Sequence, residues 1–308
     1  MFKQFSIILF SIFFIFGSTS KAEVNIAVTI DDKIITNYDI QDEADYLKIL
    51  NPNLNQLTNK KILEISKESL IREIIKKNEI DKVFDFSIEN PFVNEYLKNL
   101  YTKLNFNNEV EFNEYITSST NYSLDDIKYK LKIELAWNEL IYFKYSGQIN
   151  IDQEKINKKI DQFKNKTIKK YKLSEIVFKQ RKNEDLQDLM NLINSSILEV
   201  GFNNTANIYS ISDSAKFGGN IGWIDENNLS EILLKDLMLI SVGQTTDIIK
   251  IGNNFIILKV EEIKETEITI DKNKELEKMI KFETNKQLNQ FSRIFFDKSQ
   301  INYKINEK

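Results

Sequence analysis

The spacing of apolar residues changes twice along the chain. Between residues 37 and 165 they recur every three or four positions, as on the buried face of an amphipathic helix. From Thr167 the pattern becomes mainly alternating, which is typical of strands, and from Asp271 it returns to helical spacing. These changes predict a helical unit, an α+β unit inserted after it, and a final long helix.

Capping residues predict where the helices of the first unit begin. Asn37 and Thr58 carry side-chain oxygens that can accept from the free amides of a first turn. Pro91 suits the first turn of the next helix, and Ser123 with Asp126 three residues later has the form of a capping box. Short polar loops between such helices indicate one packed domain.

Short strand-like segments lie at both ends of this arrangement. Residues 24–30 alternate, turn at 31–33, and return at 34–35, which predicts a strand pair with an open edge. Residues 301–305 also alternate, but a strand this short is unstable without a sheet to join. We therefore expect the C-terminal strand to pair with the N-terminal pair, so that the two chain ends meet.

The α+β unit is predicted from a succession of strands and helices. Strands are expected over 171–178, 246–251 and 254–262, and helices over 183–200, 202–207 and 229–237.

Three of the eight glycines lie within five residues, at Gly218, Gly219 and Gly222, next to Trp223. Glycine is favoured where φ is positive or where another backbone approaches closely. We interpret the first two as a tight turn, and Gly222 as a close backbone approach beside a buried tryptophan.

The first residues have the composition of an export signal. Lys3 precedes an apolar run over 5–16, and the small residues Ser20 and Ala22 fit a cleavage site near Ala22. The run is shorter than the roughly 20 residues of a spanning helix. A cleaved signal peptide over 1–22 is therefore the preferred interpretation, and an uncleaved anchor is the alternative.

Composition narrows the classes of function. With 42% hydrophobic and 29% charged residues the chain is of globular type. The absence of cysteine excludes disulfides and thiolate metal sites, and the formal charge of −4 argues against nucleic acid as a partner. No phosphate-binding glycine motif is present, so we expect no nucleotide, no cofactor and no metal ion.

Several motifs appear in an order that resembles the parvulin family of peptidyl-prolyl isomerases. They are KLSEIVF at 172–178, YS at 209–210, FGGNIGW at 217–223, VGQ at 242–244 and GNNFIILKV at 252–260.

The segments around the motifs resemble SurA-type periplasmic chaperones, which carry unfolded outer-membrane proteins. The similar segments are 27–40, 69–80 and 287–305. The resemblance implies an α+β protein in which a SurA-like helical core domain is closed by a C-terminal helix and strand and carries one parvulin-like domain. The implied division is signal peptide 1–22, helical domain 23–165, parvulin-like (PpiC) domain 166–266 and closing segment 267–308.

The resemblance also implies where an active site would lie. The family uses two histidines, whereas this chain contains none. Their positions fall at Glu175 and Ile256, and the polar position of the site falls at Ser212. Isoleucine forms no side-chain hydrogen bond and an ionised glutamate only accepts, so isomerase activity is expected to be weak or absent. We expect Glu175 at the rim, solvated or paired with a lysine, and the apolar proline pocket at Leu229, Leu233 and Phe255.

The leading interpretation is an ATP-independent periplasmic holdase for unfolded outer-membrane proteins. The alternatives are a residual peptidyl-prolyl isomerase and a membrane-anchored assembly partner. Expected partners are unfolded polypeptides and, in addition, the outer-membrane assembly machinery. A groove between the helical and parvulin-like domains is expected to bind clients through exposed aromatic side chains, namely Tyr96, Tyr101, Phe106, Tyr115 and Tyr122.

Overall fold

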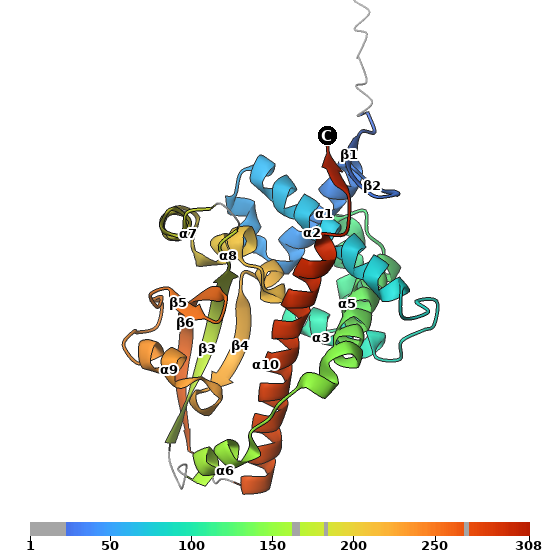
Figure 1. Cartoon of the computed structure of the whole chain (residues 1–308). Helices are drawn as coiled ribbons and strands as arrows, with labels where there is room; N and C mark the ends of the chain where they lie inside the picture. The colour runs from blue at the N-terminus through green and yellow to red at the C-terminus, as the bar shows by residue number, and fades with distance from the viewer. Residues whose placement is uncertain (1–22, 162–166, 182–183, 268–270) are drawn as a thin grey trace, which may run out of the picture.

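The computed structural model describes residues 23–161, 167–181, 184–267 and 271–308. A helical unit and a sheet unit lie side by side, and the long helix α10 (Lys272–Gln300) runs between them (Figure 1). The leader expected over residues 1–22 lies outside the described residues. No helix in the described part of the chain combines the length and the apolarity that a membrane span requires.

The helical unit has the predicted capping residues with two exceptions. Helix α3 begins at Val93 with Phe92 at its N-cap, so Pro91 lies before the helix and not in its first turn. Thr36 rather than Asn37 caps the first helix, because Thr36 and Asp39 exchange hydrogen bonds in a capping box. Ser123 and Asp126 form the predicted box. The helices are α1 (Asn37–Leu50), α2 (Asn59–Asp81), α3 (Val93–Lys103), α4 (Glu109–Ser119), α5 (Leu124–Tyr145) and α6 (Gln153–Asp161), with 3-10 turns η1 (Pro52–Gln56) and η2 (Ser146–Gln148).

A three-stranded antiparallel sheet joins the two chain ends. Its strands β1 (Ile26–Ile30), β2 (Lys33–Thr36) and β7 (Ile305–Glu307) follow the order β2-β1-β7. The predicted meeting of the ends is confirmed, but the closing strand starts four residues later than expected. Helix α10 continues to Gln300 and a turn follows, which leaves Ile301 83% exposed instead of paired.

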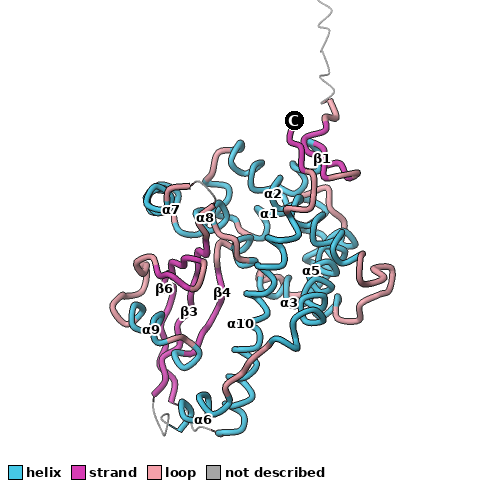
Figure 2. Tube along the Cα trace, viewed as in Figure 1, coloured by secondary structure: helices cyan, strands magenta, loops and turns pink. Residues whose placement is uncertain are grey.

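A second antiparallel sheet, of order β4-β3-β6-β5, forms the inserted unit (Figure 2). Its central strands β3 and β6 pair along their whole length and are longer than the sequence predicted. The elements are β3 (Thr167–Phe178), α7 (Leu186–Val200), α8 (Phe202–Tyr209), η3 (Asp213–Phe217), β4 (Asn220–Asp225), η4 (Glu226–Asn228), α9 (Glu231–Leu237), β5 (Ile249–Ile251) and β6 (Asn254–Glu267).

Buried side chains form separate cores in the two units. In the helical unit Trp137 of α5 lies between α2 and α10, and its indole N–H donates to Ser292 Oγ at 2.8 Å. The C-terminal helix is therefore part of this core. In the sheet unit the period-two alternation of β6 places Ile256 on the face covered by α9, and Phe255 on the face covered by α7 and α8.

The glycine cluster builds the turn between η3 and β4. Gly218 adopts the left-handed conformation, with φ of 66°. Gly219, with φ of 82°, is the site of close approach, because a Cβ there would lie 2.3 Å from the carbonyl oxygen of Glu175. Gly222 has φ of 76° beside a β-bulge, but a Cβ there would meet nothing within 4 Å, so the close approach expected at Gly222 is wrong. Trp223 is also not buried, and Lys264 lies over its ring.

Candidate functional site

Two of the three positions that the parvulin resemblance implies are in direct contact. Ser212, at the start of η3, donates its hydroxyl to Glu175 Oε1 at 2.6 Å, and Ser214 donates to the same oxygen at 3.0 Å. Strand register places Val177 opposite Ile256, so Glu175 and Ile256 lie on one face of the sheet. The sheet and the η3 turn therefore bring Glu175 and Ser212 together.

The chemistry of this site differs from the expectation for Glu175. Among the described residues Glu175 has no lysine partner, and its carboxylate is held by two serine hydroxyls. Ile256 is buried in the core beneath α9. The Glu175 carboxylate accepts hydrogen bonds from its neighbours, and the Ile256 side chain forms none. Neither side chain therefore offers a hydrogen-bond donor to a bound amide. Sequence reasoning missed the serine partners, although the alternation Ser210, Ser212 and Ser214 was visible.

The expected proline pocket does not form as one surface. Leu229 and Leu233 belong to the core beneath α9, on the same face of the sheet as Ile256. Phe255 points to the opposite face, where it stacks on Phe178 with ring centroids 5.5 Å apart. Adjacent residues of a strand face opposite ways, and Phe255 is adjacent to Ile256. The prediction that all three apolar residues line one pocket is therefore wrong for Phe255.

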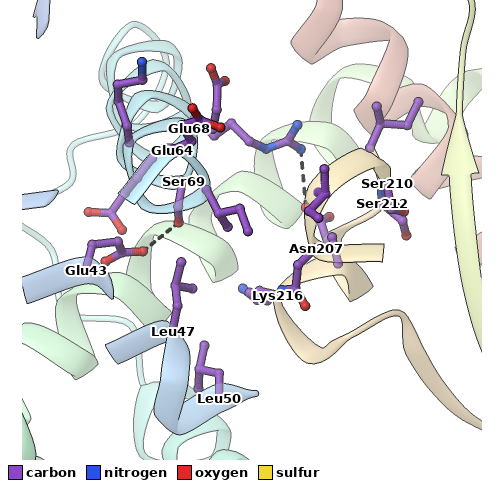
Figure 3. A pocket seen from close by; sticks show the side chains of 18 of the residues that line it. Glu43, Leu47, Leu50, Glu64, Glu68, Ser69, Asn207, Ser210, Ser212 and Lys216 are labelled. Atoms are coloured by element: carbon purple, nitrogen blue, oxygen red, sulfur yellow. Dashed lines mark hydrogen bonds and ion pairs between the residues drawn. The ribbon is translucent and has the colours of Figure 1, made fainter. Parts of the chain in front are cut away.

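A cavity of about 540 Å³ lies between the helical unit and the sheet unit. Leu47 and Leu50 of α1 and Ser69 of α2 approach it from one side, and Ser210 and Ser212 come from the other (Figure 3). The residues between α8 and η3 that carry the implied site thus also form a wall of this cavity. Its remaining apolar lining consists of Tyr46, Ile65, Leu131, Ile208, Tyr209, Ile211 and Ala215.

Ion pairs fasten the η3 segment to the helical unit across this cavity. Lys76 of α2, whose side chain is only 5% exposed, lies 2.9 Å from Glu134 and 3.3 Å from Asp213. Lys216 reaches Glu134 at 3.3 Å, and Arg72 lies 3.9 Å from Asp213. Asp213 is the neighbour of Ser212, so the same turn carries both the implied site and the inter-unit ion pairs. We refer to Arg72, Lys76, Glu134, Asp213 and Lys216 as the η3 ion cluster.

The charges of this cluster stabilise one another. Burial favours a raised pKa for Glu134, but Lys216 and Lys76 outweigh it and hold that pKa below its usual range. Lys76 lowers the pKa of Asp213. Burial opposes the charge on Lys76, yet Asp213 and Glu134 together raise its pKa. All three groups are therefore ionised at neutral pH, and a charged contact joins the two units.

A second charge cluster supports the cavity from within the helical unit. Lys130 lies 2.8 Å from Glu43 and 2.7 Å from Glu73, and Tyr122 and Ser69 donate to Glu43 at 3.0 and 2.6 Å. Burial opposes the charge on Lys130, but the two glutamates raise its pKa well above the ordinary value. Tyr122 is thus a hydrogen-bond donor inside the unit.

The aromatic residues expected to bind clients lie elsewhere. Tyr96 and Tyr115 are exposed, whereas Tyr101, Phe106 and Tyr122 pack half-buried against the second helical core beside α3 and α4. None of the five lines the cavity between the units. Tyr101 and Phe106 pack against Phe112 of α4, and Tyr122 packs against Tyr46, contacts that single-helix periodicity does not reveal. The prediction that they form the inter-unit groove is wrong.

Comparison with known proteins identifies the sheet unit. Residues 171–262 match the family described as "Rotamase: PPIC-type PPIASE domain". A curated relative, the periplasmic chaperone PpiD of Buchnera aphidicola subsp. Schizaphis graminum, is 28% identical over 270 residues, which are 80% of this chain and 41% of that relative. The chain thus spans less than half the length of this relative.

Solved structures of similar proteins give low superposition scores. A structure described as that of SurA-like chaperones PEB4 and Cj1289 of Campylobacter jejuni is 18% identical, with a TM-score of 0.33, and covers 92% of this chain and 98% of its own. The foldase PrsA of Streptococcus pneumoniae is 13% identical, with a TM-score of 0.29, and covers 90% of this chain and 92% of its own. The family match to the sheet unit, whose motifs surround Glu175, Ser212 and Ile256, therefore carries the assignment. Within residues 171–262 the chain carries a domain that matches the PpiC-type peptidyl-prolyl isomerase family.

Proposed function

We propose that this protein is an ATP-independent periplasmic chaperone that holds unfolded outer-membrane proteins, and that its parvulin domain contributes negligible isomerase activity. The observation that carries the proposal is the chemistry of the implied active site. Glu175 accepts two serine hydroxyls, and Ile256 is part of the core. The description of the Buchnera relative as a periplasmic chaperone supports the same class of function.

X-Pro isomerisation needs no nucleophile, because an enzyme lowers a barrier of about 18–20 kcal/mol by distorting and desolvating the amide. Aimed hydrogen bonds supply much of that stabilisation. Here Ser212 is the remaining hydroxyl of the three implied positions, and its proton is directed at Glu175 at 2.6 Å. The donor is therefore occupied within the protein, which favours binding over catalysis.

The cavity between the two units is our candidate for the client groove. Its walls combine apolar side chains with charged rims, which suits an extended chain held by side-chain burial and by hydrogen bonds to its backbone. The η3 segment lies on one wall, so a client there would contact the parvulin domain and the helical unit together. Such contact is broad and individually weak, as a holdase requires.

Aggregation of a chemically unfolded outer-membrane protein tests the proposal. We expect the chain from residue 23 to suppress light scattering without ATP. We also expect Ile65→Ser combined with Ile208→Ser to weaken that suppression, because both half-buried side chains line the cavity. Leu198→Ser is the matched control, since Leu198 is an exposed leucine outside the cavity. Equal suppression by all three proteins places client binding elsewhere, and no suppression by the parent chain rejects the holdase function.

Residual isomerase activity is the second candidate, and the match to the PpiC family favours it. Leu233 of α9 is half-buried above the buried Leu229 and Ile256, and it is the accessible apolar side chain of the three. The rate of isomerisation of a short Xaa-Pro peptide is to be measured with the parent chain and with Leu233→Ala. We expect no acceleration by either protein. An acceleration that Leu233→Ala abolishes would establish catalysis without histidine.

We infer that the protein is exported, with cleavage near Ala22, and that it works beside the outer-membrane assembly machinery. The export pattern of the first 22 residues and the description of the Buchnera relative support a periplasmic location. Mass spectrometry of the protein from its native envelope tests the inference. A mature N-terminus at Glu23 is expected, whereas an intact leader in the membrane fraction supports the anchored alternative.

We also infer that residues 166–266 fold as a domain, and that 23–165 and 267–308 form the other. The two cores beneath and above the four-stranded sheet support this division, because they share no buried residue with the helical cores. A fragment of residues 166–266 is expected to unfold cooperatively by circular dichroism. A fragment without a cooperative transition contradicts the division.

A further inference from the structure

The loop between α2 and α3 covers part of the outer face of α5. Phe84 packs edge-on against Phe143 with centroids 5.9 Å apart, and Phe86 packs in the same way against Tyr129 at 5.5 Å. This loop lies on the side of the helical unit that faces away from the four-stranded sheet (Figure 2). A cavity of about 490 Å³ lies between the loop and α5. We call it the loop pocket.

The loop pocket is apolar and accessible. Ile88 and Phe92 line it and are 68% and 57% exposed, while the floor is formed by the buried Ile80 and Leu135. Large apolar side chains exposed singly are ordinary, but several around one hollow indicate a binding surface. Aromatic rings at the edge of such a hollow favour a further ring in edge-to-face contact. The volume is sufficient for one large side chain and its neighbours.

The rim of the loop pocket is acidic. Asp85, Glu89 and Glu139 line it, and none of the three forms an ion pair with another residue of the described chain. Lys132 is the basic residue of the lining, and its ammonium lies 4.6 Å from the centroid of Phe86. Asp85 accepts hydrogen bonds from the backbone N–H and the hydroxyl of Ser87, at 2.9 and 2.7 Å. Carboxylates without an ion-pair partner around an apolar hollow complement a ligand that is apolar at its centre and cationic at its sides.

We propose that the loop pocket anchors an extended polypeptide segment in which an aromatic side chain is flanked by lysine or arginine. The aromatic side chain enters between the loop and α5, and the flanking cations face Asp85, Glu89 and Glu139. This inference rests on the proposed holdase function and specifies one class of client segment. The loop pocket shares no lining residue with the cavity between the units. Two separate contacts along one unfolded chain raise the affinity beyond that of either contact alone.

Fluorescence anisotropy of short labelled peptides tests the proposal. The probes are glycine-serine peptides with a central Lys-Phe-Lys, Glu-Phe-Glu or Lys-Ser-Lys, and the protein is the chain from residue 23. We expect Lys-Phe-Lys to bind about tenfold more tightly than the other two. Ile88→Ser combined with Phe92→Ser should abolish that preference without unfolding the chain, because both side chains are mostly exposed. Glu139→Lys should weaken Lys-Phe-Lys and strengthen Glu-Phe-Glu.

The control is Leu198→Ser, which removes an apolar side chain that is 87% exposed on α7. Equal affinity for Lys-Phe-Lys in the parent and in the double variant overturns the proposal, as does equal affinity for Lys-Phe-Lys and Glu-Phe-Glu. A concentration-dependent dimer that the double variant loses, without peptide binding, also overturns it and assigns the surface to a second copy. If the protein suppresses aggregation but the double variant binds Lys-Phe-Lys like the parent, the holdase function is supported and the loop pocket is rejected. If the double variant loses Lys-Phe-Lys binding but the parent chain does not suppress aggregation, the loop pocket is supported and the holdase function is rejected.

Discussion

At the scale of single residues, the implied active site is an ordered polar contact without a free donor. Glu175 accepts from Ser212 and Ser214, and its own backbone N–H donates to the carbonyl of Gly219 at 2.8 Å. Side chain and backbone of one residue thus hold both ends of the η3 turn against β3. Glu175 therefore links the η3 turn to β3.

Glu175→Ala is expected to lower the free energy of unfolding by about 2 kcal/mol, because two hydroxyls lose a charged acceptor. Glu175→Gln keeps an acceptor oxygen and should cost about half as much. Urea unfolding of both variants measures the difference. If Glu175→Ala unfolds at the same urea concentration as the parent, water replaces the carboxylate as acceptor without a loss of stability.

The glycine cluster allows two neighbouring substitutions to be compared. Gly219→Ala combines a positive φ with a Cβ that would meet the Glu175 carbonyl, so we expect a loss of about 3 kcal/mol or more. Gly222→Ala has an open surrounding and a similar φ, so about 1–2 kcal/mol is expected. Thermal unfolding of both variants provides the test. Similar losses at the two positions would show that positive φ alone sets the requirement.

At the scale of elements, the C-terminal segment completes the helical unit. The Tyr303 hydroxyl donates to Glu79 at 2.7 Å, and the Lys308 N–H donates to the carbonyl of Ala27 at 2.9 Å. Glu307 of β7 also pairs with Lys67 of α2. The last few residues therefore contact both the first strand and the second helix.

Deletion of residues 303–308 is expected to destabilise the helical unit by about 3 kcal/mol, from lost burial of Tyr303 and Ile305 and lost strand pairing. Ile301→Ser is the matched control and should change stability by less than about 0.5 kcal/mol, because Ile301 is exposed. Hydrogen exchange of the backbone amides of β1 measures the loss of strand pairing locally. Unchanged protection of β1 after the deletion contradicts a structural role for β7.

At the scale of the whole molecule, the two units meet through a polar contact. The η3 ion cluster lies at its centre, Asn51 donates to Asn207 at 2.5 Å, and Lys179 pairs with Asp297 of α10. The Asp213 side chain is 55% exposed, so water and dissolved salt weaken its ion pairs with Lys76 and Arg72. Polar contacts of this kind open more readily than apolar cores.

We expect the units to separate as pH falls below about 4. The pKa values of Glu134 and Asp213 are lowered in the closed contact, so the contact is stabilised above their ordinary values of about 4 and loses that stabilisation as they protonate. Resonance energy transfer between fluorophores attached to Glu114→Cys and Lys235→Cys measures the separation. The labelling is specific because the parent chain contains no cysteine. Asp213→Asn should reduce energy transfer already at neutral pH.

Lys77→Ala is the control for this experiment, since it removes an ion pair with Asp81 that lies within α2. Its transfer efficiency should follow that of the parent at every pH. Transfer by Asp213→Asn that equals that of the parent at neutral pH contradicts the role of the η3 ion cluster.

Local patterns in the sequence were enough to predict the order of helical and sheet units, the α+β class and the resemblance of the sheet unit to parvulins. Apolar spacing and capping residues act within one or two turns of chain, so they can be recognised in the sequence without knowledge of the fold. Residue identity also limits the chemistry of the implied site, because Ile256 forms no side-chain hydrogen bond in any conformation. The meeting of the chain ends followed from an open edge and an unpartnered strand.

Contacts between side chains far apart in the sequence could be read from the folded chain alone. Lys76 and Asp213 are 137 residues apart, and no local pattern pairs them. The serine partners of Glu175 depend on how the η3 turn lies against β3, and the exposure of Ile301 depends on where α10 ends. The aromatics beside α3 and α4 were predicted as a surface but are largely packed, because helix packing chooses which faces are covered. Contacts of this kind arise from the joint packing of all elements, and single-segment patterns do not encode them.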